Sequence, residues 1–175
     1  MFTGLLGKSN VKRTAERLHG SAVGQSRAPA LYTNLGAPDS VEGRFEQLTL
    51  HLILLIERLK GEPGEPAAVR QTLFDTYVNY LDGAIREMGV GDLAVGKRMR
   101  KLGEAFYGRA RSYDEAFAAL PDTAPLEAVV QRTLLPPQSA VGPGGLAAYA
   151  LACREALARQ DVATLLKGGP HWPAP

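Results

Sequence analysis

The residues most suited to metal binding or acid–base catalysis are the three histidines, and their spacing does not support such a site. His19, His51 and His171 are far apart, and no carboxylate–histidine spacing would place two ligands on one turn of a helix. Glu46 and His51 are five residues apart, which puts them on different faces of a helix. We therefore expect no metal site, and we interpret His51 as a core or boundary residue of an apolar helix.

The chain has a single cysteine, Cys153, which cannot form an internal disulfide or supply a thiolate zinc site. Its helical spacing from Tyr149 and Leu157 is typical of a small core residue. No serine lies in the strand–turn–helix context of a nucleophilic serine. We expect no catalytic residue and no cofactor, so the chain is not expected to be an enzyme.

Residues 91–97 partly match the sequence pattern of a nucleotide-binding loop. Residues 91–97 have the glycine and lysine spacing of a phosphate-binding loop, but Arg98 stands where a hydroxyl should reach the magnesium ion. A helix is expected before this segment, whereas a phosphate-binding loop follows a strand. We therefore expect no nucleotide binding.

Length and composition indicate one globular domain. The 175 residues are 45% apolar and 22% charged, with 20 Lys and Arg against 18 Asp and Glu, so the net charge is +2. This balance argues against a disordered chain and against a polycation that coats nucleic acid, and no DNA partner is expected. The longest apolar run, residues 48–56, is too short to span a membrane. The apolar stretch at residues 1–7 is short and its basic residues follow it, unlike an export signal.

Basic residues are nevertheless concentrated in residues 86–111, which contain seven basic and three acidic side chains. On a helical wheel most of them lie opposite an apolar stripe. The candidate basic face consists of Lys97, Arg98, Arg100, Lys101, Arg109 and Arg111. Two interpretations are open: a solvated helix face, or a surface for an anionic partner such as lipid head groups, RNA or an acidic protein.

Periodic apolar residues predict three long helices that begin near Asp39, Pro66 and Asp92, and Asp39 with Glu42 resembles a capping box. Their apolar stripes are Val41, Phe45, Leu48, Leu52, Leu55 and Leu59; Val69, Leu73, Tyr77, Leu81, Ile85 and Met88; and Met99, Leu102, Phe106, Tyr113 and Phe117. Shorter helices are expected at about 10–24, 27–35, 123–134, 143–159 and 161–167. The predicted fold class is all-α: one compact domain over residues 1–175, with six to eight helices around an antiparallel three-helix core. Eight of the 12 prolines lie in the C-terminal region, residues 121–175.

The first long helix raises two further questions. Leu50, Ile53 and Leu54 fall outside its main apolar stripe, so either the terminal helices cover them or they form part of a groove for an apolar client. Arg44 lies in the first turn, where the helix dipole disfavours a cation. It should therefore have a carboxylate partner, such as Asp75 or Asp82 on the next helix.

Several segments together resemble the ubiquinol–cytochrome c chaperone family. They are residues 38–46, 48–51, 58–59, 73–75, 86–92, 96–97 and 106–113, in order over about 31–118. Ser40 stands where the family pattern has threonine, which keeps a hydroxyl. The motif residues to which the resemblance assigns a structural role are Asp39, Gly43, Arg44, Phe45, Asp75, Arg86, Glu87, Gly89, Gly91, Asp92, Tyr107 and Gly108.

The resemblance implies an all-helical, ATP-independent assembly chaperone for the cytochrome bc1 complex. It implies that the client is newly made cytochrome b, and that a ribosome and a small partner protein take part. It further implies a bacterial-type member in the cytoplasm beside the inner membrane. In this interpretation Leu50, Ile53 and Leu54 contact the client, and the basic face meets lipid, RNA or client loops. The alternative is a peripheral lipid- or RNA-contacting helical protein without client specificity.

Overall fold

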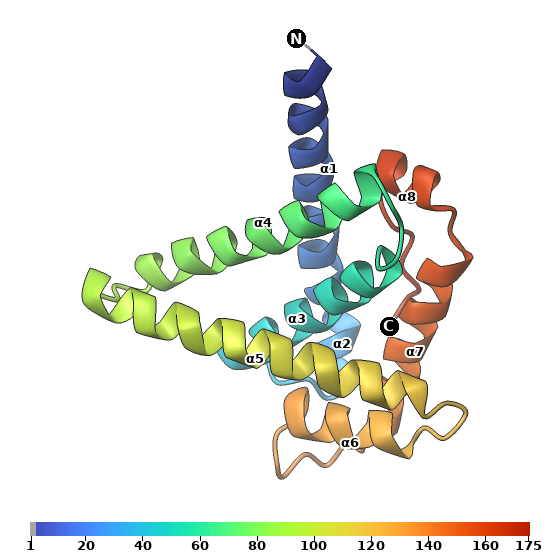
Figure 1. Ribbon diagram of the computed structural model, residues 1–175. Coiled ribbons are helices and arrows are strands. Elements are labelled where there is room, and N and C mark those ends of the chain that lie inside the picture. Colours follow the sequence, from blue (N-terminus) through green and yellow to red (C-terminus); the bar gives the residue numbers. More distant parts are fainter. Residues whose placement is uncertain (1–2) are drawn as a thin grey trace.

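The computed structural model describes residues 3–175, with the side chains of residues 8–92 and 94–175, as eight helices and no strand (Figure 1). The helices are α1 (Thr3–Ser26), α2 (Pro29–Thr33), α3 (Val41–Arg58), α4 (Glu65–Glu87), α5 (Asp92–Ala118), α6 (Ala124–Thr133), α7 (Gly144–Arg159) and α8 (Val162–Gly168). The prediction of an all-helical chain with six to eight helices is confirmed. The first two residues of the apolar N-terminal stretch lie outside the described residues.

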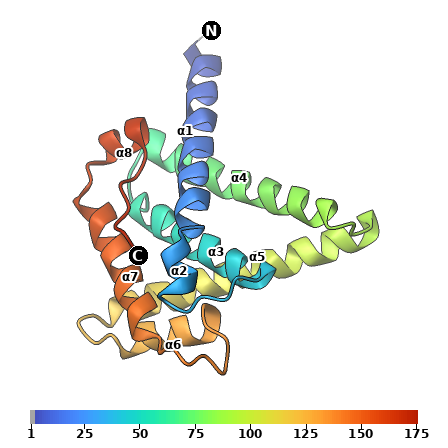
Figure 2. The same cartoon turned by 180° about the vertical axis from the view of Figure 1, so that it is seen from behind.

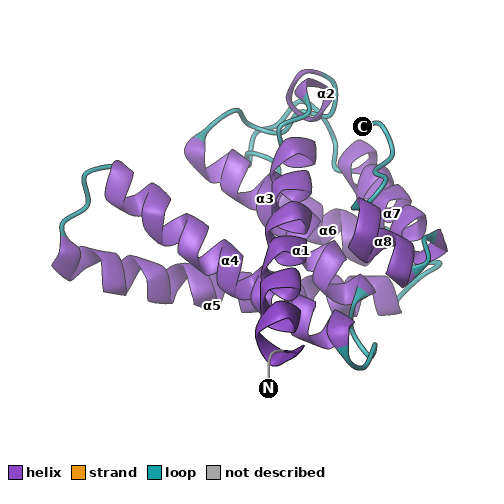
Figure 3. Ribbon diagram, turned by 90° about the horizontal axis from the view of Figure 1, so that it is seen from above, coloured by secondary structure: helices purple, strands orange, loops and turns teal. Residues whose placement is uncertain are grey.

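Helix α3 lies at the centre of the arrangement. Helices α4 and α5 form a long antiparallel hairpin that extends to one side, while α7 and α8 lie on the opposite side (Figures 1 and 3). Helix α1 crosses α4, and these two helices make the most extensive contact in the molecule. Seen from behind, α1 crosses in front of α3 and α7 lies beside them, and both helices contact α3 (Figure 2).

The start of α3 differs in detail from the prediction. Ser40, rather than Asp39, is the N-cap, and its hydroxyl accepts a hydrogen bond from the amide of Gly43 at 3.0 Å. Asp39 instead accepts a hydrogen bond from Arg44 at 2.7 Å. The predicted capping box is therefore wrong, and the hydroxyl at position 40 has the role that a threonine would also fill.

Helix α3 is buried on nearly all sides, which settles the position of its second group of apolar residues. Leu50, Ile53 and Leu54 are at most 3% exposed and belong to the main core. Helices α1, α4, α5 and α7 all contact α3 and leave none of its middle turns open. The expectation that these three residues form a client groove is therefore corrected: they are core residues.

Two polar side chains of α3, those of Thr49 and His51, have specific partners inside this core. The hydroxyls of Thr49 and Tyr77 lie 2.8 Å apart and link α3 to α4. His51 Nδ1 lies 2.7 Å from the carbonyl oxygen of Gln47, and Nε2 lies 2.8 Å from the hydroxyl of Tyr149 on α7. Because a buried polar group without a partner costs about 1–3 kcal/mol, these contacts fix the rotation of α3 against its neighbours.

The proline-rich end of the chain is packed rather than loose. The indole of Trp172 donates a hydrogen bond to Ser21 on α1 at 3.0 Å and lies edge-on to His51. Gln25 on α1 donates to the carbonyl oxygen of Pro173 at 2.9 Å. The C-terminal segment therefore closes the core on the side of α1 and α7.

Gly43 allows a test of the close contact between the first turn of α3 and the segment that precedes it. A Cβ at this position would lie 2.0 Å from the carbonyl oxygen of Pro38, whereas a Cβ at Gly108 in α5 would meet nothing within 4 Å. We expect Gly43→Ala to lower the free energy of unfolding by at least about 2 kcal/mol, since backbone must move. Gly108→Ala should raise it by about 0.5–1 kcal/mol through helix propensity. Urea denaturation measures both, and equal effects would contradict the close approach at Gly43.

His51 gives the fold a pH dependence. Burial lowers its pKa from 6.5 to about 4, because the charged form is poorly solvated in the core. At a pH above 6.5 the histidine is neutral in both the folded and the unfolded chain, and its burial carries no charge penalty. As the pH falls toward the pKa of the folded state, the unfolded chain binds the proton more readily, so the folded state loses stability. We expect the free energy of unfolding to fall between pH 6.5 and about 4, by up to about 3 kcal/mol.

Urea titrations at several pH values measure this loss. Burial also lowers the pKa of His19, so it adds to the same trend. His51→Gln should flatten the pH profile, because it removes the buried imidazole. A wild-type profile without a slope in this range would contradict the account of a buried, neutral His51.

Candidate functional site

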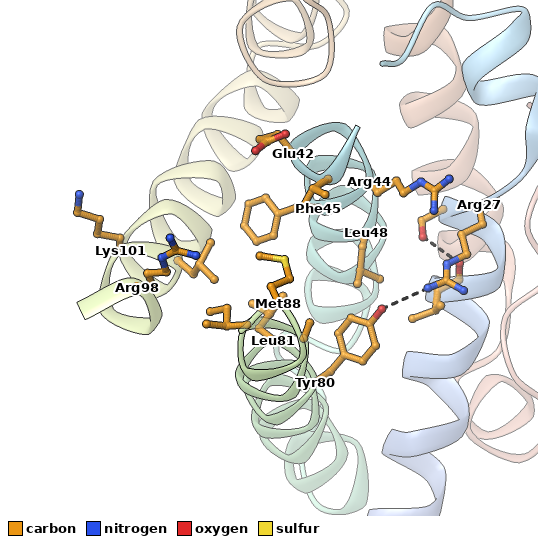
Figure 4. A pocket seen from close by; sticks show the side chains of 16 residues that line it. Arg27, Glu42, Arg44, Phe45, Leu48, Tyr80, Leu81, Met88, Arg98 and Lys101 are labelled. Carbon is orange, nitrogen blue, oxygen red and sulfur yellow. Dashed lines mark hydrogen bonds between the residues drawn. The ribbon is translucent and has the colours of Figure 1, made fainter. Parts of the chain in front are cut away.

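An apolar groove of about 440 Å³ is formed by the end of α1, the start of α3, the end of α4 and the first turns of α5. Figure 4 shows side chains from these helices pointing toward one another across it. The apolar residues that line the groove are Val23, Val41, Phe45, Leu48, Leu81, Ala84, Ile85, Met88 and Leu102, together with the ring of Tyr80.

Apolar residues that the core does not cover gather at this groove. Val41 and Met88 were expected in the buried stripes of their helices, but they are 63% and 55% exposed. Tyr80 is exposed as well, so three of the five exposed large apolar residues among the described side chains line one groove. Exposed apolar residues are thus concentrated at this groove rather than scattered singly over the surface.

The α4–α5 hairpin positions two of the four walls. Gly89 has a φ of +76°, which a glycine adopts readily, and it ends α4 directly after Met88. Phe106 on α5 packs against Phe74 and Tyr77 on α4, with ring centroids 5.2 and 5.5 Å apart. These contacts hold the two helices together below the tip of the hairpin.

Charged residues surround the apolar floor. The cations that line the groove are Arg27, Arg44, Arg98 and Lys101, and the acidic residue is Glu42. Figure 4 shows Arg98 and Lys101 on one side of Phe45 and Met88, and Arg27 and Arg44 on the other. The groove therefore combines an apolar floor with a positively charged rim.

The sequence suggested Asp75 or Asp82 as the partner of Arg44. This expectation is wrong, because Arg44 pairs with Asp39 just before α3. The hydrogen bond between their side chains raises the pKa of Arg44 and lowers that of Asp39. Asp82 pairs with Arg86 instead, and Asp75 accepts a hydrogen bond from Gln71. The partner of Arg44 thus holds it at the mouth of the groove.

A second, polar pocket of about 280 Å³ adjoins the groove. Arg27 and Arg44 line both cavities, so they stand at the junction between them. Tyr32, Thr33, Asp39 and Pro29 complete the polar pocket. Burial raises the pKa of Tyr32, and its hydroxyl donates a hydrogen bond to the carbonyl oxygen of Ser26 at 2.6 Å.

The candidate basic face divides into two groups. Arg109 is half-buried and donates two hydrogen bonds to Glu46, at 2.7 and 3.0 Å, and this pairing raises its pKa. Arg111 is exposed and pairs with Glu115 at 2.8 Å. Lys97, Arg98, Arg100 and Lys101 are exposed, and none of them pairs with a carboxylate among the described side chains. The uncompensated charge therefore lies at the start of α5, next to the groove.

The family-motif residues do not form one cluster. Arg44 and Phe45 line the groove, whereas Arg86 joins Asp82 and Asp92 across the hairpin turn. The motif glycines have structural positions: Gly43 lies against Pro38, Gly89 ends α4, Gly91 precedes α5 and Gly108 lies within it. Tyr107, Glu87 and Asp75 are exposed on the hairpin, and Tyr107 contacts Phe74.

The groove also contains residues that sequence reasoning did not single out. Arg27 directly follows α1, whereas Glu42 lies in α3 and Tyr80 in α4, so no spacing within one helix indicates that they meet. Arg27 donates a hydrogen bond to the hydroxyl of Tyr80 at 3.3 Å, which links α1 to α4 at the edge of the groove.

The residues examined for catalytic chemistry in the sequence have the following positions in the described structure. Cys153 is fully buried, and burial raises the pKa of its thiol to about 11. No group of three or more histidine, cysteine or carboxylate side chains with described positions could hold a metal ion. The segment with phosphate-loop spacing forms the first turns of α5 and follows a helix, without the required strand.

No described helix has the length and apolar character needed to cross a membrane.

Comparisons with known proteins agree with this architecture. The structure is similar to the crystal structure of the Cbp3 homolog from Brucella abortus, with a TM-score of 0.85 and 32% sequence identity, over 99% of this chain and 97% of that one. No curated protein matches the sequence significantly. The family model described as ubiquinol-cytochrome C chaperone matches residues 33–172, most of the chain. The chain therefore belongs to the ubiquinol–cytochrome c chaperone family.

Proposed function

We propose that this protein binds unassembled cytochrome b during assembly of the cytochrome bc1 complex, and that the groove between α1, α3, α4 and α5 is the client site. Membership of the family makes the chain a bc1 assembly chaperone. The observation that supports the client site is the clustering of the exposed side chains Val41, Tyr80 and Met88 in one groove. Client contact is therefore assigned to this groove and no longer to Leu50, Ile53 and Leu54, which are buried.

The size of the groove limits what it can hold. A membrane-spanning helix is ~30 Å long and ~10 Å wide, which corresponds to more than ~2000 Å³. The groove has a volume of about 440 Å³, so it accepts side chains from one face of a helix rather than a whole span. Helix-in-groove binding uses anchors at i, i+3, i+4 and i+7, which fits this volume. The chaperone would thus cover an apolar helix face until the client's partner subunits arrive, without ATP.

We place this activity in the cytoplasm, beside the inner membrane. The uncompensated cations at the start of α5, Lys97, Arg98, Arg100 and Lys101, provide a surface for anionic lipid head groups. The same surface is compatible with ribosomal RNA near a nascent client. A small partner protein, as the family resemblance implies, belongs to the same proposal.

Deletion and complementation test the client site. Cells without the gene should contain little assembled bc1 complex, and the wild-type gene should restore it. The double variant Val41→Gln, Met88→Gln should not, because each substitution removes about 1 kcal/mol of apolar burial, or about 30-fold in affinity for the pair. Measurements are the spectroscopic cytochrome b content and co-purification of cytochrome b with the chaperone.

The matched control is the double variant Tyr107→Gln, Val141→Gln, which replaces two exposed apolar residues outside the groove. It should restore bc1 content like the wild type. A normal bc1 content in the deletion strain would refute the proposed function. Equal behaviour of the two double variants would refute the assignment of the groove.

A second candidate function, general binding to anionic membranes, rests on the four unpaired cations at the start of α5. It predicts that the purified protein binds vesicles of phosphatidylglycerol and phosphatidylcholine, and that 0.5 M salt releases it. Lys97→Glu with Arg100→Glu should abolish vesicle binding, because it reverses two exposed charges on that helix. Unchanged binding would show that this face does not meet the membrane.

A further inference from the structure

The cations around the groove lie along its two opposite edges. Arg27, just after α1, and Arg44 on α3 lie on one side of the apolar floor, and Arg98 and Lys101 on α5 lie on the other (Figure 4). Between them are apolar side chains, including those of Phe45 and Met88. The groove is thus an apolar strip with positive charge along both edges.

On the α1 and α3 side, the two guanidinium groups retain donors for a ligand. Arg27 makes a single side-chain hydrogen bond, from Nη2 to the hydroxyl of Tyr80 at 3.3 Å, and it has no carboxylate partner among the described side chains. Arg44 uses Nε for Asp39, and its side chain is more than half exposed. Because each guanidinium has five N–H donors, four on each remain without a hydrogen-bond partner among the described residues.

On the α5 side, Arg98 and Lys101 are exposed and have no carboxylate partner with a described position. The acidic residues at the groove and its mouth are Glu42 and Asp39, and Asp39 is occupied by Arg44. Cations thus outnumber carboxylates at the rim. The excess positive charge is complementary to an acidic partner rather than to a neutral or basic one.

We infer that the groove recognises an amphipathic helix of the client that carries acidic residues on both flanks of its apolar face. A helix is ~10–12 Å across with its side chains, so one lying in the groove has its two flanks toward the two edges. Carboxylates on both flanks would then reach Arg27 and Arg44 on one side and Arg98 and Lys101 on the other. An amphiphile with one anionic head group would satisfy only one edge, which favours a peptide over a lipid.

This inference rests on the proposed function and defines the client segment more closely. Its test uses the purified full-length protein and three fluorescent 15-residue helical peptides. All have leucine at i, i+3, i+4 and i+7, and they carry glutamate, glutamine or lysine on both flanks. In anisotropy titrations the glutamate peptide should bind about tenfold tighter than the glutamine peptide, because two to four exposed ion pairs contribute modestly each. The lysine peptide should bind more weakly than both.

Charge reversals locate the effect. Arg98→Glu with Lys101→Glu should weaken the glutamate peptide about tenfold or more and strengthen the lysine peptide, and Arg27→Glu should act in the same direction. The matched control is Lys97→Glu with Arg100→Glu, which changes the net charge equally on the same helix but at residues that do not line the groove. It should change binding by less than about threefold, as expected for screened charges. Circular dichroism confirms that each variant is folded.

Several outcomes would overturn the inference. Equal binding of the glutamate and glutamine peptides would show that the rim does not select acidic flanks. An equal loss in the groove pair and the control pair would show only long-range attraction. Displacement of the glutamate peptide by lower concentrations of oleate than of unlabelled peptide would identify a lipid as the occupant.

The inference and the proposed function fail in different ways. If the Val41→Gln, Met88→Gln variant loses cytochrome b while the peptides show no charge preference, the client groove stands and the acidic flanks are refuted. If the peptides show the preference while that variant retains cytochrome b, the groove binds acidic helices but cytochrome b is held elsewhere.

Discussion

The nearly complete burial of α3 is the constraint on which the other elements depend. A helix that is apolar on most of its surface must be covered on several sides, and here α1, α4, α5 and α7 supply the cover. Its polar side chains then limit how these helices can approach, because Thr49 needs Tyr77 and His51 needs Tyr149. The result is one core in which residues from both ends of the chain meet.

The groove is a consequence of where this covered helix begins. Of α3, the first turns line the groove, and the ends of α1 and α4 and the start of α5 form its other walls. Met88 therefore stays exposed, although it lies on the same apolar face of α4 as the buried residues before it. The same hairpin bears the uncompensated cations of α5, so exposed apolar surface and positive charge coincide there.

Helix periodicity was sufficient to predict the all-α fold, because stripes such as Val69, Leu73 and Tyr77 depend only on local geometry. The candidate site was harder to predict, since its walls come from four helices. An apolar excess in α3 is equally compatible with a buried helix and an open groove, and only the packing of α1 and α7 decides between them. Likewise the pair of Arg109 and Glu46 joins residues far apart in sequence, so no spacing reveals that this charge is compensated.

The central claim is that client contact occurs in the groove between α1, α3, α4 and α5. It is tested most directly by placing a photo-crosslinking amino acid at Met88, inside the groove, and at Tyr107, which is similarly exposed outside it. On irradiation of cells that are synthesising cytochrome b, the account predicts a covalent adduct with cytochrome b from position 88 and little from position 107. An adduct only from position 107, or equal adducts from both, would contradict it.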